Sequence, residues 1–154
     1  MQYRKMGNTG LTPSALGFGM MRLPRGEDGK FDQEESTRLL RWAIDNGLTY
    51  VDTAYTYETS EVVTGNALRD GYREKVTLAT KAQVYAFMCE EDFDRILDEQ
   101  LSRLQTDHID CYLLHALNRE TWHDNVLKYN VLEHMKAAKA AGKIRHMGFS
   151  FHDN

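Results

Sequence analysis

Short apolar segments alternate with longer amphipathic ones along this chain, and three of the short segments end at a reactive side chain. These end residues are Asp52, Lys81 and His115. Strands that alternate with helices favour βαβ units, in which neighbouring strands run parallel and the crossovers are right-handed. Parallel α/β sheets place their active sites at the carboxyl ends of the strands. We therefore expect these three side chains to meet at one edge of a single sheet.

The alternation predicts five strands and four main helices, and so an α/β fold with a parallel sheet. The strands are expected at residues 15–21, 48–52, 76–80, 109–114 and 144–150. The helices are expected at residues 32–46, 60–70, 93–104 and 126–141, where apolar residues recur with helical spacing. Residues 1–13 should form a short hairpin, and residues 116–125 should form a loop.

Local signals set the expected helix limits. Asp32 is a good N-cap for the first helix, and Glu35 is placed to close a capping box behind it. Gly47 is expected just past the end of the same helix, whose apolar face is expected to include Trp42. Ser60 is expected to cap the second helix.

Length and composition limit the possible functions. The chain of 154 residues is expected to form one domain, residues 1–154, whereas a complete (β/α)8 barrel typically needs about 250 residues. A formal net charge of −4 without a basic cluster gives no reason to expect a nucleic-acid partner. No apolar stretch is long enough to cross a bilayer or to form a signal peptide, and the two cysteines lack metal-ligand spacing. We therefore expect a soluble cytoplasmic protein without a membrane partner or a metal site.

The segments that end in reactive residues resemble a known family. Residues 52–57 read Asp-Thr-Ala-Tyr-Thr-Tyr, and they are followed by Lys81 at one strand end and by Leu114–His115 at the next. In order and rough spacing these segments strongly resemble the catalytic segments of the aldo-keto reductases. Residues 3–7 and 14–23 are similar to the N-terminal hairpin and first barrel strand of that family, and residues 142–150 are similar to its fifth strand.

The resemblance implies the N-terminal half of a TIM-type (β/α) barrel, made of the hairpin, about four βα units and a fifth strand. Residues 113–118 and 149–152 look closer to a branch whose longer members carry a C-terminal ferredoxin-like iron–sulfur segment. The implied activity is NAD(P)H-dependent reduction of an aldehyde or ketone to an alcohol, here in a partial chain. In this family most contacts to the cofactor come from the second half, so the isolated chain should show little or no reductase activity.

The resemblance assigns a catalytic role to Asp52, Tyr57, Lys81 and His115. Reduction of a carbonyl by hydride needs an acid that protonates the forming alkoxide, and Tyr57 would supply that proton. A neighbouring cation favours the phenolate, which would be the role of Lys81, and Asp52 would keep Lys81 charged and oriented. His115 would hydrogen-bond the carbonyl oxygen and position it.

The resemblance also implies cofactor contacts. The backbone of Gly19 and Met20 should lie near the nicotinamide of NADPH or NADH beside Asp52, and Ser150 should contact the carboxamide. Phe151 stands where many family members carry asparagine, which departs from their usual Ser-Asn carboxamide clamp. Tyr55 and Trp122 are candidate walls of a pocket for a small-molecule carbonyl substrate.

Each of the four catalytic candidates also has an ordinary structural explanation when it is taken alone. Asp52 fits a loop cap, Tyr57 fits half-buried packing, Lys81 fits a solvated strand end and His115 fits a satisfied core histidine. Their coincidence on successive strand ends favours an inherited catalytic constellation.

Two other functional classes stay open at this point. One is a barrel lyase in which Lys81 forms a Schiff base with a carbonyl substrate. The other is a truncated, non-catalytic half-barrel that associates with another chain. Because half a barrel leaves two sheet edges unpaired and its apolar interior open, we expect self-association into a dimer or a larger species.

Overall fold

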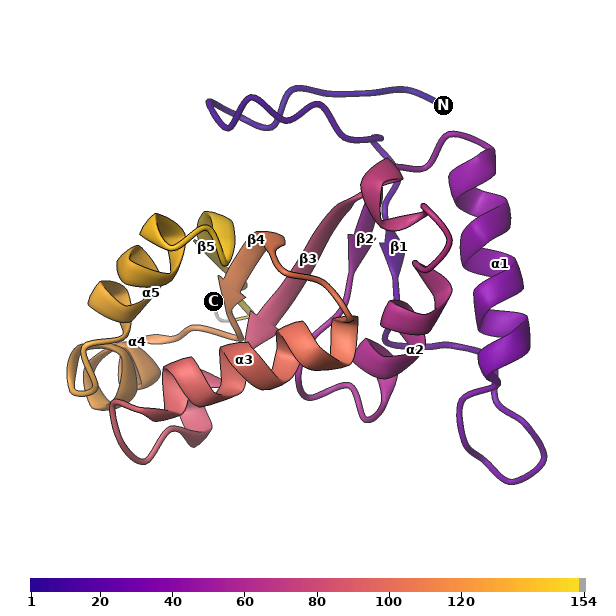
Figure 1. Ribbon diagram of the computed structural model, residues 1–154. Coiled ribbons are helices and arrows are strands. Elements are labelled where there is room, and N and C mark those ends of the chain that lie inside the picture. Colours follow the sequence, from indigo (N-terminus) through magenta and orange to yellow (C-terminus); the bar gives the residue numbers. More distant parts are fainter. Residues whose placement is uncertain (153–154) are drawn as a thin grey trace.

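The computed structural model describes residues 1–152 and places five strands side by side in one sheet, in chain order (Figure 1). All four strand pairs are parallel. The strands are β1 (Phe18–Gly19), β2 (Tyr50–Asp52), β3 (Thr77–Ala82), β4 (Ile109–Leu114) and β5 (Ile144–Phe149). This arrangement confirms the expected α/β fold and the partial barrel of parallel strands.

Helices connect the strands and cover one face of the sheet. The main helices are α1 (Gln33–Asp45), α2 (Ser60–Ala67), α3 (Asp92–Leu104) and α5 (Val131–Ala140). Shorter turns are η1 (Arg73–Lys75), η2 (Val84–Ala86), α4 (Arg119–Thr121) and the π-helical η3 (Trp122–Leu127). Along the sheet α1 contacts α2, α2 contacts α3 and α3 contacts α5. The helices therefore follow one another around the outer side of the sheet, as crossovers of one hand require.

Side chains alternate between the two faces of the sheet because successive residues of a strand point in opposite directions. On the helix-covered face Val51, Leu78 and Tyr112 are fully buried in the hydrophobic core. Burial of such a side chain contributes about 1.5–3 kcal/mol. The other face corresponds to the interior of the barrel, and Asp52 and Lys81 lie on it by alternation.

The N-terminal hairpin forms, but as a single antiparallel bridge between Tyr3 and Ser14. Backbone hydrogen bonds from Arg4 to Pro13 and from Met6 to Leu11 extend the pairing. The hairpin lies across the end of the sheet where the strands begin (Figure 1), and Ser14 there bonds to Thr49 just before β2. It closes the amino end and leaves the carboxyl end open.

Two of the expected helix caps differ in the structure. Asp32 caps α1 by accepting the Glu35 N–H at 2.9 Å, as expected, but the Glu35 carboxylate pairs with Arg38 at 2.6 Å. The capping box is therefore only half formed. Ser60 is the first residue of α2 rather than its cap, because its hydroxyl donates to the backbone oxygen of Met20. Gly47 has the expected left-handed conformation, with φ at 92°.

The helix expected at residues 126–141 is interrupted. Asn130 adopts a left-handed conformation, with φ at 53°, and α5 begins only after it. Part of the expected loop at 116–125 is instead helical, in α4 and η3. The prediction for Trp42 was also wrong, because this side chain is 65% exposed on the outer side of α1.

The described sheet is open at both sides. Within residues 1–152 β1 pairs only with β2, and β5 pairs only with β4. None of the helices in this range is both long enough and apolar enough to cross a membrane.

Candidate active site

Asp52 and Lys81 form an ion pair at the carboxyl end of the sheet. The Lys81 Nζ donates to Asp52 Oδ1 at 2.5 Å and to the backbone oxygen of Thr53 at 2.8 Å. The pair forms because Asp52 lies beside Ala79 in the parallel register, so Lys81 on the same strand points to the same face two residues further on. The Lys81 side chain is 7% exposed and the Asp52 side chain 30%. Lys81 is therefore held from two sides in a nearly dry position.

Tyr57 lies over this ion pair. The β2–α2 loop turns back on itself through hydrogen bonds from Tyr57 to Ala54 and from Ser60 to Tyr57. The Tyr57 ring is consequently half-buried, and the Lys81 Nζ lies 5.1 Å from its centroid. An ammonium group at this distance from an aromatic face is attracted to the ring.

His115 completes the group from the end of β4. Its ring packs edge-on against Tyr57, with centroids 5.7 Å apart and planes at 84°. Its Nδ1 lies 3.3 Å from the hydroxyl of Thr56. Burial lowers the pKa of His115 from its usual 6.5, and the nearby positive charge of Lys81 lowers it further. The imidazole is thus mainly neutral at pH 7.

The structure therefore brings together all four residues that the sequence singled out for catalysis. Thr53 and Thr56, which the sequence analysis did not single out, also contribute. Thr53 holds Lys81 through its backbone oxygen, and Thr56 contacts His115 through its hydroxyl. No sequence signal points to a backbone oxygen, because every residue has one.

Gly19 lies beside Asp52 in the register of β1 and β2. A Cβ added to Gly19 would meet nothing within 4 Å, so the space above this position is open. The next residue, Met20, is fully buried, and its N–H donates to the backbone oxygen of Asp52 at 2.8 Å. Its own backbone oxygen accepts from Ser60 at 2.6 Å. The polar backbone groups of Met20 are thus already in use and its side chain is buried, so Met20 offers no exposed group to a ligand in this structure.

Ser150 lies next to His115 at the end of β5. Its N–H donates to Leu114, and its Oγ accepts from the N–H of Ala116 at 2.8 Å. At this contact Ala116 adopts a left-handed conformation, with φ at 52°. Because Oγ acts here as an acceptor, the hydroxyl hydrogen of Ser150 can still be donated to a ligand.

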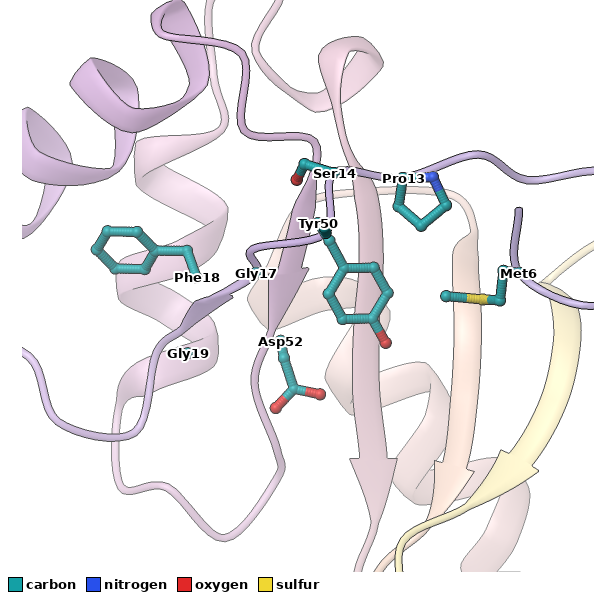
Figure 2. Close-up of a pocket in the computed structure, with 9 residues that line it drawn as sticks. Met6, Pro13, Ser14, Gly17, Phe18, Gly19, Tyr50 and Asp52 are labelled. Carbon is teal, nitrogen blue, oxygen red and sulfur yellow. The ribbon is translucent and has the colours of Figure 1, made fainter. Parts of the chain in front are cut away.

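A cavity of about 390 Å³ opens on the inner face between the hairpin and the first two strands (Figure 2). The Asp52 carboxylate and the Tyr50 ring point into it, whereas the Phe18 side chain points away. Burial, followed by the nearby Cys111 and Asp52, raises the pKa of Tyr50. The cavity reaches Asp52 but is not lined by Lys81, Tyr57 or His115.

The two candidate pocket walls have other contacts. The Tyr55 hydroxyl donates to Glu99 at 2.9 Å, and the Arg103 guanidinium stacks on the Tyr55 ring at 4.4 Å, so this side chain is turned toward α3. Trp122 lines an apolar groove of about 270 Å³ beside β5, together with Leu132 and Phe149. In the described part of the chain, no three His, Cys, Asp or Glu side chains gather as a metal site.

Comparison with protein families matches residues 15–154 to the aldo/keto reductase family. Among curated relatives, the aldo-keto reductase YhdN of Bacillus subtilis (strain 168) is 33% identical over 97% of this chain and 47% of its own length.

Solved structures give the same result. The holo form of the aldo-keto reductase AKR11C1 from Bacillus halodurans superposes with a TM-score of 0.81 at 30% identity, over 98% of this chain and 50% of that protein. An aldo/keto reductase from Klebsiella pneumoniae in complex with NADP and acetate superposes with a TM-score of 0.77 at 34% identity. That match covers 93% of this chain and 47% of the other. The chain thus spans about half the length of the relatives it matches.

Proposed function

The chain belongs to the aldo/keto reductase family, and from that premise we propose that its residues form the catalytic half of an NAD(P)H-dependent oxidoreductase. The reaction would reduce an aldehyde or a ketone to an alcohol. The observation that supports this most strongly is the Lys81–Asp52 ion pair, which lies under the Tyr57 ring, while that ring packs against His115. This grouping combines a proton donor, a cation beside it and a neutral hydrogen-bond donor at one strand edge.

We assign each residue a role that is consistent with its contacts. Tyr57 would donate the proton to the carbonyl oxygen, and the Lys81 ammonium would stabilise the phenolate that remains. Asp52 and the Thr53 backbone oxygen would fix the position of that ammonium. When the Thr56 hydroxyl donates to His115 Nδ1, the proton of the neutral ring lies on Nε2, from which it can be donated to the substrate oxygen.

The residues present fit the nicotinamide end of a cofactor. The open space above Gly19 and the free hydroxyl hydrogen of Ser150 would accept a planar ring and its carboxamide oxygen. Asp52 would lie beside that ring, and the buried Met20 would hold the neighbouring Gly19 in place through its hydrogen bonds with Asp52 and Ser60. When bound, the cofactor supplies the hydride. The NADP in the Klebsiella pneumoniae structure favours NADPH over NADH.

The proposal is tested with the 154-residue chain and with a chimera in which it precedes the second half of the Bacillus halodurans relative. Aldehyde-dependent absorbance loss at 340 nm should appear in the chimera and be nearly absent from the chain alone. If the missing half supplies about 4 kcal/mol of cofactor binding, affinity falls by roughly a thousandfold in the chain alone, as calorimetric titration with NADPH would show. A folded chimera without turnover would contradict the proposal.

The lyase alternative needs Lys81 as a free amine that can attack a carbonyl carbon. The contacts of Lys81 with Asp52 and Thr53 favour a fixed ammonium instead. Borohydride treatment in the presence of an aldehyde should therefore leave Lys81 unmodified, and a reduced adduct on Lys81 would favour the lyase.

We also propose that the chain self-associates when it is present at this length. Exposed apolar side chains lie near both open edges, because Leu16 precedes β1 and Phe149 ends β5, and the groove at Trp122 adjoins β5. Unpaired edges and exposed apolar patches both favour association. Sedimentation velocity at micromolar concentration should show a dimer or larger species, and a folded monomer would contradict this. The cytoplasmic location and the absence of a metal remain predictions from the sequence.

A further inference from the structure

A buried polar cluster lies behind β3, on the face that the helices cover. It consists of Glu61 from α2, Thr80 from β3, Gln100 from α3 and Tyr112 from β4, none of which is more than 1% exposed. Thr80 Oγ1 and Gln100 Nε2 each donate to Glu61 Oε1 at 2.6 Å. Tyr112 donates to Gln100 Oε1, also at 2.6 Å. The cluster is thus closed by hydrogen bonds between four different elements.

The cluster reaches the main chain of Lys81. Gln100 Nε2 lies 3.2 Å from the Lys81 backbone oxygen, which also accepts from the N–H of Tyr55 at 3.2 Å. Thr80 immediately precedes Lys81 and points to the opposite face of the sheet. The strand end is therefore held from its outer face by the cluster, while the Lys81 side chain projects from the inner face toward Asp52.

A second layer of charges closes the cluster toward the solvent. Arg103 Nη1 lies 3.4 Å from Glu61 Oε2, and Arg103 also bonds to Glu99. The same guanidinium stacks on Tyr55, whose hydroxyl bonds to Glu99. Tyr55 belongs to the loop that carries Tyr57, so the charged layer joins the catalytic loop to α3.

Burial of a carboxylate is costly, and apolar side chains of similar volume often stabilise a protein as well or better. Desolvation raises the pKa of Glu61, whereas the bonds from Thr80 and Gln100 and the charge of Arg103 lower it. Stability alone therefore does not account for this cluster. The cluster is better explained by the fixed geometry that it gives to the end of β3, because a fully satisfied buried network admits few alternative arrangements.

We propose that Glu61 and Gln100 are positioning residues that fix the end of β3, so that Lys81 meets Asp52 below Tyr57. This inference rests on the proposed reductase function only for the reason why Lys81 needs a fixed position. The geometry itself concerns the position of Lys81, and it can be tested without cofactor or substrate. A failure of the reductase assay and a failure of this inference are therefore distinguishable.

The test compares the reactivity of two lysines in the 154-residue chain. Sulfo-NHS-acetate acetylates amines, and peptide mass spectrometry gives the rate at Lys81 relative to the exposed Lys136 of α5. Glu61→Leu removes the acceptor from Thr80 and Gln100, whereas Glu61→Gln keeps an amide oxygen in the same place. All variants are compared at a temperature below the unfolding transition of the least stable one.

The matched control is Asp110→Leu. Asp110 is also a buried carboxylate, but it lies near the amino end of β4, where it accepts from the Leu78 N–H at 2.9 Å and pairs with Arg73 at 2.9 Å. Its removal should lower stability without freeing Lys81. The control therefore separates local positioning from general loosening of the fold.

We expect Glu61→Leu to raise the Lys81 to Lys136 rate ratio by about tenfold or more, equivalent to about 1.4 kcal/mol. Glu61→Gln and Asp110→Leu should leave the ratio within about twofold of the parent. If Glu61→Leu does not fold, Thr80→Val gives the same test, because it removes one donor of the cluster without changing the side-chain shape. An unchanged ratio in folded Glu61→Leu, or in Thr80→Val where it takes the place of that variant, would overturn the inference, and so would an equal rise in Asp110→Leu.

Discussion

Replacement of Asp52 by asparagine tests whether loss of the Lys81–Asp52 ion pair lowers the stability of the fold as much as loss of a buried ion pair does. The substitution keeps the shape of the side chain and removes its charge. The Lys81 ammonium, whose side chain is 7% exposed, would then keep only the Thr53 oxygen at 2.8 Å and a neutral amide. The chain should therefore lose stability, although no packing is removed.

The magnitude follows from the burial of the two partners. Removal of one partner from a fully buried pair costs about 3–5 kcal/mol. Because the Asp52 side chain is 30% exposed, water can replace part of the lost interaction, so we expect a loss of about 2 kcal/mol. For a domain of this size that loss lowers the unfolding midpoint by about 4–8 °C.

Urea denaturation followed by circular dichroism at pH 7 measures this loss. Lys81→Met leaves the partly hydrated Asp52 carboxylate, so it should cost about 1 kcal/mol of stability. The double variant should be about as stable as Lys81→Met alone.

The control is Asp98→Asn. Its pair with Lys143 has the same 2.5 Å separation, but its side chains are 60% and 40% exposed. That change should cost less than about 0.5 kcal/mol, and an Asp52→Asn loss no larger than the control would refute the reasoning.

Two further predictions concern stability. Because the pKa of His115 is lowered from 6.5, the folded chain binds fewer protons than the unfolded chain just below that pH. The stabilisation by the neutral His115 side chain should be complete above about pH 6.5 and should decrease as the pH falls below that value. Urea denaturation of the parent and of His115→Gln over this pH range measures it. If the free energy of unfolding changes with pH equally in both, the prediction is contradicted. Gly65→Ala should cost about 3 kcal/mol in urea denaturation, because its Cβ would lie 2.5 Å from the Arg103 backbone oxygen. Gly19→Ala, whose Cβ meets nothing within 4 Å, is the control and should cost less than about 1 kcal/mol; equal losses would contradict the packing argument.

The order of the strands and the position of Asp52, Lys81 and His115 could be predicted from the sequence. The reason is physical, since strands that alternate with helices must run parallel, and parallel strands bring their carboxyl ends to the same edge. Residues placed at those ends therefore meet without any knowledge of the loops between them. The Lys81–Asp52 contact follows from this rule and from the register of β2 and β3.

The details that the sequence did not reveal depend on contacts between distant segments. Ser60 has the chemistry of a helix cap, but the Met20 oxygen, 40 residues away, takes its hydroxyl instead. Gln100 lies on the apolar face of α3, seven residues after Phe93, and the sequence does not show that it meets Glu61 of α2 there. Both side chains are buried because they satisfy each other. Trp42 fits an apolar stripe and is nevertheless exposed, since the described chain places no neighbouring element over that side of α1.

The most direct test of the proposed site is Tyr57→Phe in the chimeric barrel. The phenolic hydroxyl is needed only when charge develops on the substrate oxygen, so the loss should appear in kcat rather than in cofactor binding. We expect kcat to fall by about 10²–10⁴-fold, while calorimetric titration with NADPH gives an affinity within about twofold of the parent. A Tyr57→Phe chimera that turns over within about threefold of the parent would show that Tyr57 is not the proton donor.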